Sequence, residues 1–161
     1  MENIVTLEER VVSALMSKGW HICFAESCTA GLACARLVNV ANASAVLNES
    51  FVTYANEAKV KYVGVDPLSI EKYGVVSERV ALEMATGACR ASDSQVGVGI
   101  SGIAGPGGGS AAKPVGTVCF GFNINGGEYA VTKHFENADR QGVRQASVDF
   151  VFEFLSKKLS E

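Results

Sequence analysis

The chain of 161 residues has no excess of basic side chains, because 14 lysines and arginines stand against 17 aspartates and glutamates and give a formal net charge of −3. The sequence has no run of lysines and arginines of the kind that forms a nucleic-acid surface or a polybasic membrane patch. No apolar run approaches the ~20 residues that span a bilayer, and no basic leader precedes an apolar stretch as in an export signal. These absences predict a cytoplasmic protein with no nucleic-acid or membrane partner.

Metal-ligand patterns are also missing. The chain has two histidines, His21 and His134, and five cysteines whose spacings match no zinc site. An odd number of cysteines, lying mostly in core-like segments, is typical of reduced thiols in a cytosolic protein. We therefore expect no structural metal and no cofactor.

The hydrophobic share of 48% and the charged share of 19% fit one compact domain over residues 1–161. Periodicity and turn signals place the elements along the chain. The expected elements are a helix over 5–18, a strand over 20–25, a helix over 29–38, a strand over 51–54, a helix over 57–63 capped by Asn56, a short helix after Asp66-Pro67, a long helix from Ser77, a strand over 95–100, strands over 115–124 and 128–135 joined by Asn125-Gly126-Gly127, and a helix from Asp139 to near Leu159. The pattern predicts an α/β fold, a three-layer sandwich with helices on both faces of a mixed sheet that ends in a hairpin and a long C-terminal helix.

The last of these helices carries more apolar residues than one core-facing stripe needs. Its stripe is widened by Val148, Phe152 and Leu159. We interpret the surplus as a subunit contact and expect a homo-oligomer.

A small polar cluster interrupts an apolar run where a strand hands over to a helix. It places Ser27 and Thr29 at the expected helix N-terminus, where a hydroxyl nucleophile gains a site for a developing oxyanion. An ordinary Ser/Thr cap is the alternative. Cys28 is a second candidate nucleophile, since a helix N-terminus also lowers a thiol pKa. Neighbours in a first helical turn point about 100° apart, so only one of the two can face a site.

A serine nucleophile needs a base, and lysine is the better candidate in this chain. His21 and His134 both fall inside expected strands, away from natural active-site loops. Lys59 follows a strand on the next helix, which corresponds to the position of Ser27, and burial can keep a lysine neutral near pH 7. A surface lysine is the alternative. The short S-x-x-K strings at Ser69 to Lys72 and Ser110 to Lys113 are of a kind that arises by chance.

A glycine-rich loop runs from Ser101 to Gly109. Residues 97–102, which overlap the start of this loop, match G-x-G-x-x-G. Two of these glycines lie inside the expected strand, and Pro106 forbids a helix directly after the loop begins. We therefore treat the match to a dinucleotide-binding turn as false. The loop's successive N–H groups can form an anion or oxyanion nest, and a wide surface turn is equally compatible. Arg140 and Arg144 have i,i+4 spacing and could together clamp a phosphate; solvated arginines are the alternative.

Four linked motifs resemble the CinA C-terminal domain family over nearly the whole chain. They are Ala25-Glu26-Ser27-Cys28-Thr29, Val52-Thr53-Tyr54-Ala55-Asn56-Glu57-Ala58-Lys59, Gly74-Val75-Val76-Ser77, and Gly102-Ile103-Ala104-Gly105-Pro106 together with Lys113-Pro114-Val115-Gly116-Thr117-Val118. The resemblance implies an amidohydrolase that converts nicotinamide mononucleotide to nicotinate mononucleotide and ammonia, with a small-molecule nucleotide as its partner.

The resemblance also implies roles for single residues. Ser27 would be the nucleophile, Lys59 its base and Tyr54 a further residue of the site, while N–H groups at 28–30 or 102–105 would hold the oxyanion. The expected substrate-binding residues are Thr29, Ala30, Gly31, Ser44, Gly102, Ile103, Ala104, Gly105, Arg140 and Arg144.

Three positions depart from the family pattern around the expected pocket. Ala30 stands in place of a usual glycine, Ala55 in place of a common serine, and the stretch around Asn42 lacks a usual glycine. If positive φ is required at Ala30 or Asn42, we expect the loop to shift. A catalytically weak member that acts as a nucleotide- or partner-binding domain is the alternative function.

Overall fold

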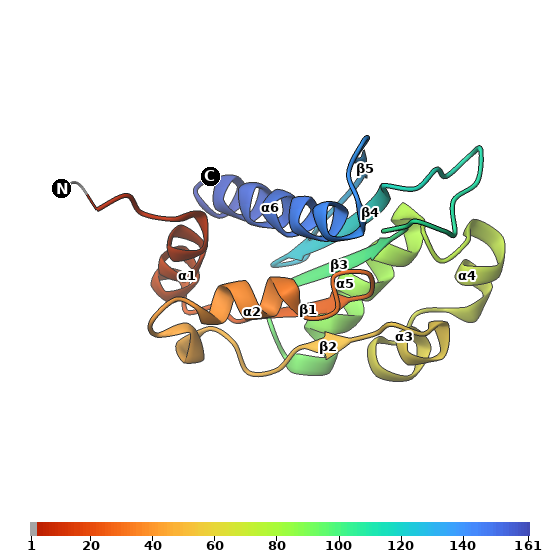
Figure 1. Cartoon of the computed structure of the whole chain (residues 1–161). Helices are drawn as coiled ribbons and strands as arrows, with labels where there is room; N and C mark the ends of the chain where they lie inside the picture. The colour runs from red at the N-terminus through yellow and green to blue at the C-terminus, as the bar shows by residue number, and fades with distance from the viewer. Residues whose placement is uncertain (1–2) are drawn as a thin grey trace.

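The structure is a computed structural model, and it describes residues 3–161. Figure 1 shows one mixed sheet with helices on both of its faces. The elements in chain order are α1 (Leu7–Lys18), β1 (Ile22–Glu26), α2 (Leu32–Val38), the 3₁₀ helix η1 (Ala43–Ala45), β2 (Phe51–Val52), α3 (Asn56–Val63), α4 (Pro67–Tyr73), α5 (Glu78–Ser92), β3 (Val96–Gly102), β4 (Thr117–Ile124), β5 (Gly127–His134) and α6 (Arg140–Leu159). The predicted α/β sandwich is confirmed.

The five strands lie in the order β2-β1-β3-β4-β5. Strands β2, β1 and β3 are parallel, whereas β4 and β5 are antiparallel to their neighbours and form the predicted hairpin. The chain leaves β1 for β2 on one side and then returns to β3 on the other. The carboxyl ends of three parallel strands therefore meet at one edge, at the switch point where open α/β sheets bind ligands.

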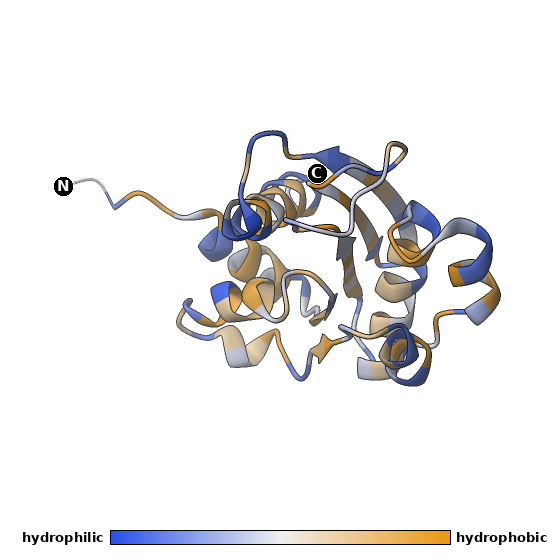
Figure 2. Cartoon of the chain, turned by 45° about the vertical axis from the view of Figure 1, so that its right-hand side comes forward, coloured by the Kyte–Doolittle hydropathy of each residue, from blue (hydrophilic) through white to orange (hydrophobic). Residues whose placement is uncertain are grey.

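Alternation along the strands divides the core between the two faces. In β1, Ile22 and Phe24 face the cluster that α1, α2 and α6 complete, whereas Cys23 and Ala25 face the cluster built with α3, α4 and α5. In Figure 2 orange bands recur along the central strands and on the helix turns that face them. The middle strands are thus buried on both faces, as expected for parallel strands covered by helices.

Glycines bring α5 into direct contact with the sheet. The alternation of β3 and β4 turns Gly97, Gly99 and Gly121 toward α5, where a Cβ would collide with backbone oxygens of Ala85 or Ala81. The G-x-G-x-x-G string lies within β3 and no helix follows it. Its first two glycines therefore serve helix packing, which confirms that it is not a dinucleotide turn.

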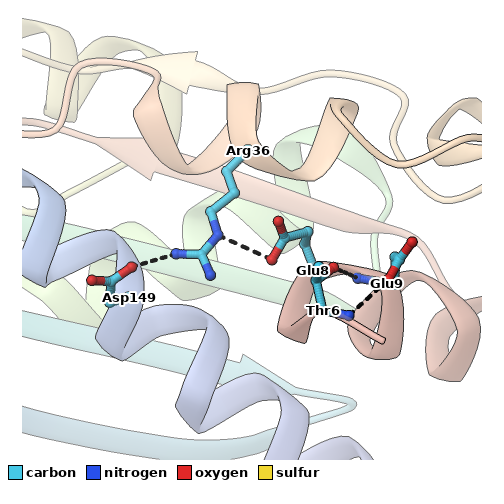
Figure 3. A network of polar contacts seen from close by, with 5 residues as sticks. All are labelled: Thr6, Glu8, Glu9, Arg36 and Asp149. Atoms are coloured by element: carbon cyan, nitrogen blue, oxygen red, sulfur yellow. Dashed lines mark hydrogen bonds and ion pairs between the residues drawn. The ribbon is translucent and has the colours of Figure 1, made fainter. Parts of the chain in front are cut away.

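One arginine joins the three helices of the opposite layer (Figure 3). Arg36 of α2 reaches Glu8 of α1 at 3.2 Å and Asp149 of α6 at 2.6 Å. At the start of α1, Thr6 and Glu9 form a reciprocal capping box. Partly exposed ion pairs contribute at most about 1 kcal/mol each, so this network orients the helices more than it stabilises them.

Several expected element ends are wrong by a few residues. Asn56 is the first residue of α3, after an N-cap at Ala55, and does not cap the helix with its side chain. The second strand ends at Val52, because the backbone of the following residues turns toward Lys59. His21 lies just before β1, whereas His134 does end β5 as expected.

The surplus apolar residues of α6 pack within the chain. Val148, Phe152 and Leu159 are buried in the core cluster shared with α1 and α2. Phe150 and Phe154 on the other flank stack on Phe120 and Phe122 of β4. The homo-oligomer stays a prediction, but these residues no longer support it. None of the helices found in residues 3–161 is long and apolar enough to cross a membrane.

We expect Gly99→Ala to lower the free energy of unfolding by about 1–3 kcal/mol, because the new methyl group would push α5 away from β3. Gly107→Ala is the matched control, since no atom lies within 4 Å of a Cβ there and its φ is not positive. Urea denaturation of both variants checks this. Equal stabilities would mean that α5 can move outward without cost.

Candidate active site

The carboxyl edge of the parallel strands surrounds a cavity of about 210 Å³. Ser27 comes from the end of β1, Tyr54 and Lys59 from the segment after β2, and Ser101 from the end of β3. Two backbone hydrogen bonds continue the sheet here, from Thr53 N to Glu26 O at 2.9 Å and from Ser27 N to Ile100 O at 3.0 Å. The sheet itself therefore fixes the backbone from which these side chains project.

Lys59 is the most unusual side chain of the site, because it is only 1% exposed and has no carboxylate partner among residues 3–161. Its Nζ lies 2.7 Å from Thr53 O, 3.2 Å from Tyr54 O and 3.2 Å from Ser27 Oγ. Burial lowers its pKa below the ordinary 10.5, while Cys28 in its ionised form and the Glu57 carboxylate act in the opposite direction. The fold thus favours the neutral amine.

Lys59 has three hydrogen-bond neighbours, and all of them can accept. Two are the carbonyl oxygens of Thr53 and Tyr54, which can only accept and so take two N–H groups. The third is the Ser27 hydroxyl, which can accept from the ammonium or, when the amine is neutral, donate its proton to the nitrogen lone pair. The hydrogen-bond reach expected between Ser27 and Lys59 is present, and the arrangement can draw the hydroxyl proton onto nitrogen.

Ser27 does not lie in the first turn of a helix, contrary to the sequence-based prediction. Helix α2 begins at Leu32 after an N-cap at Gly31, and neither Ser27 nor Thr29 caps it. The buried carboxylate of Glu26 occupies the helix end instead, accepting from Ala33 N at 2.9 Å and Cys34 N at 3.1 Å. The helix terminus is therefore already neutralised and does not serve an oxyanion.

The turn that carries Ser27 is held from both ends. Ala30 N donates to Ser27 O at 3.0 Å. Arg144 of α6 donates to Cys28 O at 2.9 Å and to Thr29 O at 3.3 Å. Arg144 thus fastens the turn to α6 through the backbone, and the structure does not pair its guanidinium with that of Arg140 across the cavity.

Two positions without glycine, Ala30 in the turn after Ser27 and Asn42 before η1, have left-handed backbone. Ala30 has φ 47° and Asn42 has φ 70°, so the expected shift of the loop is wrong. Left-handed backbone costs a residue with a Cβ roughly 1–2 kcal/mol, and Asn tolerates it better than Ala. Ala30 is therefore a strained position beside the site.

Cys28 is buried beside Ser27, and both residues line the cavity, because the segment is a turn and not the helix that would have separated them. Burial raises the pKa of the Cys28 thiol to about 11, against the smaller lowering effects of its own backbone, Arg144 and Lys59. The expectation of a lowered thiol pKa is wrong. At neutral pH this side chain is a protonated thiol and a weak nucleophile.

Arg140 joins the glycine loop to the segment that carries Tyr54. Its guanidinium donates to Gly105 O at 2.7 Å and to the Tyr54 hydroxyl at 3.1 Å. A second cavity of about 450 Å³ adjoins the first and is lined by the loop and by Arg140. The long connection between β3 and β4 thereby becomes a wall of the site.

Some of the predicted site residues converge and others do not. Six of them line the first cavity: Ser27, Tyr54, Lys59, Gly102, Ala104 and Arg140. Gly102, Ala104 and Arg140 also line the second cavity, where Ile103 and Gly105 join them. Thr29 is fully buried behind the turn, and Ala30 and Gly31 line neither cavity. Ser44 lies on η1, beside the start of β1, because Ile22 N donates to Val46 O. Within this chain it is therefore at the opposite end of β1 from Ser27.

Sequence reasoning missed several residues of the site. Glu26 gave a usable signal, since a carboxylate inside a buried strand needs dedicated partners. Ser101 at the end of β3 donates to Val75 O at 2.8 Å, which fixes the loop before α5. Val75 and Val76 line both cavities. Both valines lie in one of the four motifs of the resemblance, but their side chains carry no chemical signal, so their place at the cavities became visible only in the fold.

Comparison with known proteins identifies a family and several relatives. The family model described as the CinA C-terminal domain matches residues 4–159. A nicotinamide-nucleotide amidohydrolase, PncC, from Enterobacter agglomerans is 47% identical over 88% of this chain and 87% of its own length. A CinA-like protein from Kosmotoga olearia is 44% identical over 96% of this chain, which spans only 37% of that relative. Two Alkaliphilus relatives are matched over only 38% and 30% of their lengths.

Solved structures agree with the fold. A competence/damage-inducible protein, CihA, from Agrobacterium tumefaciens has a TM-score of 0.91 at 38% identity, covering 96% of this chain and 94% of its own. A CinA superfamily protein from Klebsiella pneumoniae has a TM-score of 0.91 at 34% identity and covers 99% of both chains.

We expect Ala30→Gly to raise the free energy of unfolding by up to about 1 kcal/mol, because relief of left-handed strain exceeds the added entropy of the unfolded chain. Ala35→Gly, on the exposed face of α2, is the control and should lower it by about 1 kcal/mol. Thermal melts of the two variants should move in opposite directions. Destabilisation by both would show that Ala30 is not strained.

Proposed function

Because the chain belongs to the CinA C-terminal domain family, we propose that it hydrolyses the carboxamide of nicotinamide mononucleotide to nicotinate mononucleotide and ammonia. The observation that carries the proposal is the buried Lys59 amine 3.2 Å from Ser27 Oγ, with both residues lining a cavity. The amidohydrolase relative that is similar over most of both chains supports the choice of substrate.

The acylation step uses Ser27 as nucleophile and Lys59 as general base. Ser27 Oγ attacks the carboxamide carbon while neutral Lys59 takes the hydroxyl proton. When the tetrahedral intermediate collapses, the C–N bond breaks and the Lys59 ammonium returns that proton to the leaving nitrogen. Ammonia departs, and the nicotinoyl group remains on Ser27 as an ester.

Water completes the reaction by the same route. Lys59, neutral again, takes a proton from water as the water oxygen attacks the ester carbonyl. The C–Oγ bond breaks, Ser27 regains a proton from the Lys59 ammonium, and the product leaves as the carboxylic acid, which loses its proton to solvent to give nicotinate mononucleotide. The two carbonyls that accept from Lys59 keep its nitrogen in place through both steps.

Backbone N–H groups near the cavity are the candidates for the oxyanion hole. An N–H group that already donates to a carbonyl oxygen of the protein is not free to bind the oxyanion. Ala30 N and Ile103 N already donate, to Ser27 O and Thr117 O. Within the described part of the chain, the N–H groups of Cys28 and Ala104 donate to no protein acceptor. Both residues line the cavity, so we assign the oxyanion to them.

A binding domain without turnover was the alternative, motivated by the missing glycines. The left-handed turn persists at Ala30 and the Ser27–Lys59 contact is intact. These observations favour the enzyme, and ligand-induced thermal stabilisation without ammonia release would favour the alternative.

We expect Ser27→Ala to lower ammonia release from nicotinamide mononucleotide by about a thousandfold or more, because the nucleophile is lost. The matched control is Cys28→Ser at the neighbouring position. It should keep most of the activity, because the wild-type Cys28 thiol is protonated and is a weak nucleophile. A coupled ammonia assay with both variants checks this. Equal rates for Ser27→Ala and wild type would reject Ser27, and loss of activity in Cys28→Ser alone would reassign the nucleophile.

The pH profile reports on Lys59, which must be neutral to act as a base. We expect kcat/KM to rise with pH through a pKa below 10.5, since burial lowers the pKa of Lys59. The charge of Glu57 raises that pKa, so Glu57→Gln should shift the rise toward lower pH.

Glu71→Gln on α4 makes the same charge change at another exposed position and should leave the profile in place. A kcat/KM that falls with increasing pH over this range would contradict the role of Lys59.

A further inference from the structure

The second cavity, between the glycine loop and the turn before α5, differs in charge from the rest of this acidic chain. Two cations, Lys113 and Arg140, line it, and no carboxylate does. Neither cation forms an ion pair with any residue in 3–161. An uncompensated pair of cations in a cavity attracts anions.

Comparison with another polar cavity shows that the charge is specific to this place. A cavity of about 380 Å³ beside α5 also contains two arginines, Arg79 and Arg90. Glu83 and Glu128 line it as well, and Arg79 pairs with Glu83 at 3.1 Å. That cavity is internally neutralised, whereas the one at the glycine loop is not.

Lys113 is held in place by the fold. Its Nζ donates to Tyr73 O at 2.9 Å, at the end of α4, and its backbone closes a tight turn with Ser110 through bonds of 2.9 and 3.0 Å. Figure 1 shows the β3–β4 connection reaching toward α4, which this bond fastens. On its other side Lys113 borders a cavity that contains Glu78, but the two side chains form no ion pair.

The loop adds neutral donors to the two cations. In the described residues the N–H groups of Gly107 and Gly108 donate to no protein acceptor, and both glycines line the cavity. Arg140 uses two nitrogens on Gly105 O and the Tyr54 hydroxyl, and the guanidinium carries five N–H groups in all. Cations with backbone amides are the donor set that binds phosphate.

The cavity continues into the catalytic one. Both are lined by Val75, Val76, Gly102, Ala104 and Arg140. A ligand with its reacting carbon at Ser27 can therefore extend past Arg140 toward Lys113. Arg144 lines neither cavity and stays on the backbone of the turn.

We propose that this cavity is the subsite for the phosphate monoester of the substrate, with Lys113 as the residue that makes the enzyme select a nucleotide over its nucleoside. Two experiments test this proposal, one kinetic and one by ligand binding. Only the kinetic experiment rests on the proposed amidase function. Arg140, at the junction of the two cavities, places the sugar between the reacting carboxamide and the phosphate.

The kinetic arm compares two substrates, nicotinamide mononucleotide and the nucleoside that lacks its phosphate. Lys113→Gln should lower kcat/KM for the nucleotide by about tenfold or more, as loss of a charge-assisted hydrogen bond predicts, and change that for the nucleoside by less than about twofold. Lys113→Arg should retain the preference. Equal losses on both substrates would mean that Lys113 only supports the loop, and would overturn the proposal.

The binding arm needs no turnover, and calorimetric titration of ribose 5-phosphate and of ribose measures it directly. Wild type should bind ribose 5-phosphate, and Lys113→Gln should bind ribose 5-phosphate about tenfold more weakly. Lys72→Gln removes the same charge from exposed α4 outside the cavity and should bind as wild type does. Unchanged binding in Lys113→Gln, or an equal loss in Lys72→Gln, would overturn the subsite. If the protein hydrolyses no nicotinamide nucleotide, the proposed function fails while this titration still decides the subsite.

Discussion

The burial of one lysine is the constraint around which this edge of the sheet is arranged. An amine that is 1% exposed must give up most of its hydration, and only two backbone carbonyls and a serine hydroxyl replace it. Neutral acceptors do not compensate a full positive charge, which favours the uncharged form. Strand β2 ends at Val52, and the carbonyls of the next two residues are the ones that accept from the amine.

Glu26, a second buried ionisable side chain, has hydrogen-bond donors as neighbours, whereas Lys59 has acceptors. Glu26 is as buried as Lys59, but two N–H groups at the start of α2 bind its carboxylate. Backbone donors at a helix end suit a negative charge. An acidic and a basic side chain therefore lie at the same sheet edge without pairing, because backbone groups bind each of them. Lys59 is the one of the two that contacts Ser27.

Much of the fold and part of the site could be predicted from the sequence, and the differences have identifiable physical causes. Periodicity and turn residues located the helices and strands, and the hairpin at Asn125 and the cap at Asp139 are confirmed. The Ser27–Lys59 proximity followed from the rule that parallel strands share a carboxyl edge. The start of α2 could not be predicted, because the carboxylate that accepts from its first-turn N–H groups belongs to Glu26, inside the preceding strand. Val75 and Lys113 were missed as well, since their places depend on how distant loops fold back over the sheet.

The two bonds from Arg144 join segments that are very distant along the chain. Arg144 and Cys28 are separated by 116 residues, the largest sequence separation among the side-chain hydrogen bonds found in the described residues. The turn that carries Ser27 is thus attached to the sheet, through Ser27 N and Ile100 O, and to the amino end of α6, through Arg144. Helix ends open locally at a lower free energy than the core of a sheet. Opening of the amino end of α6 would therefore remove the two bonds on Cys28 O and Thr29 O and leave the sheet as the remaining long-range attachment of the turn.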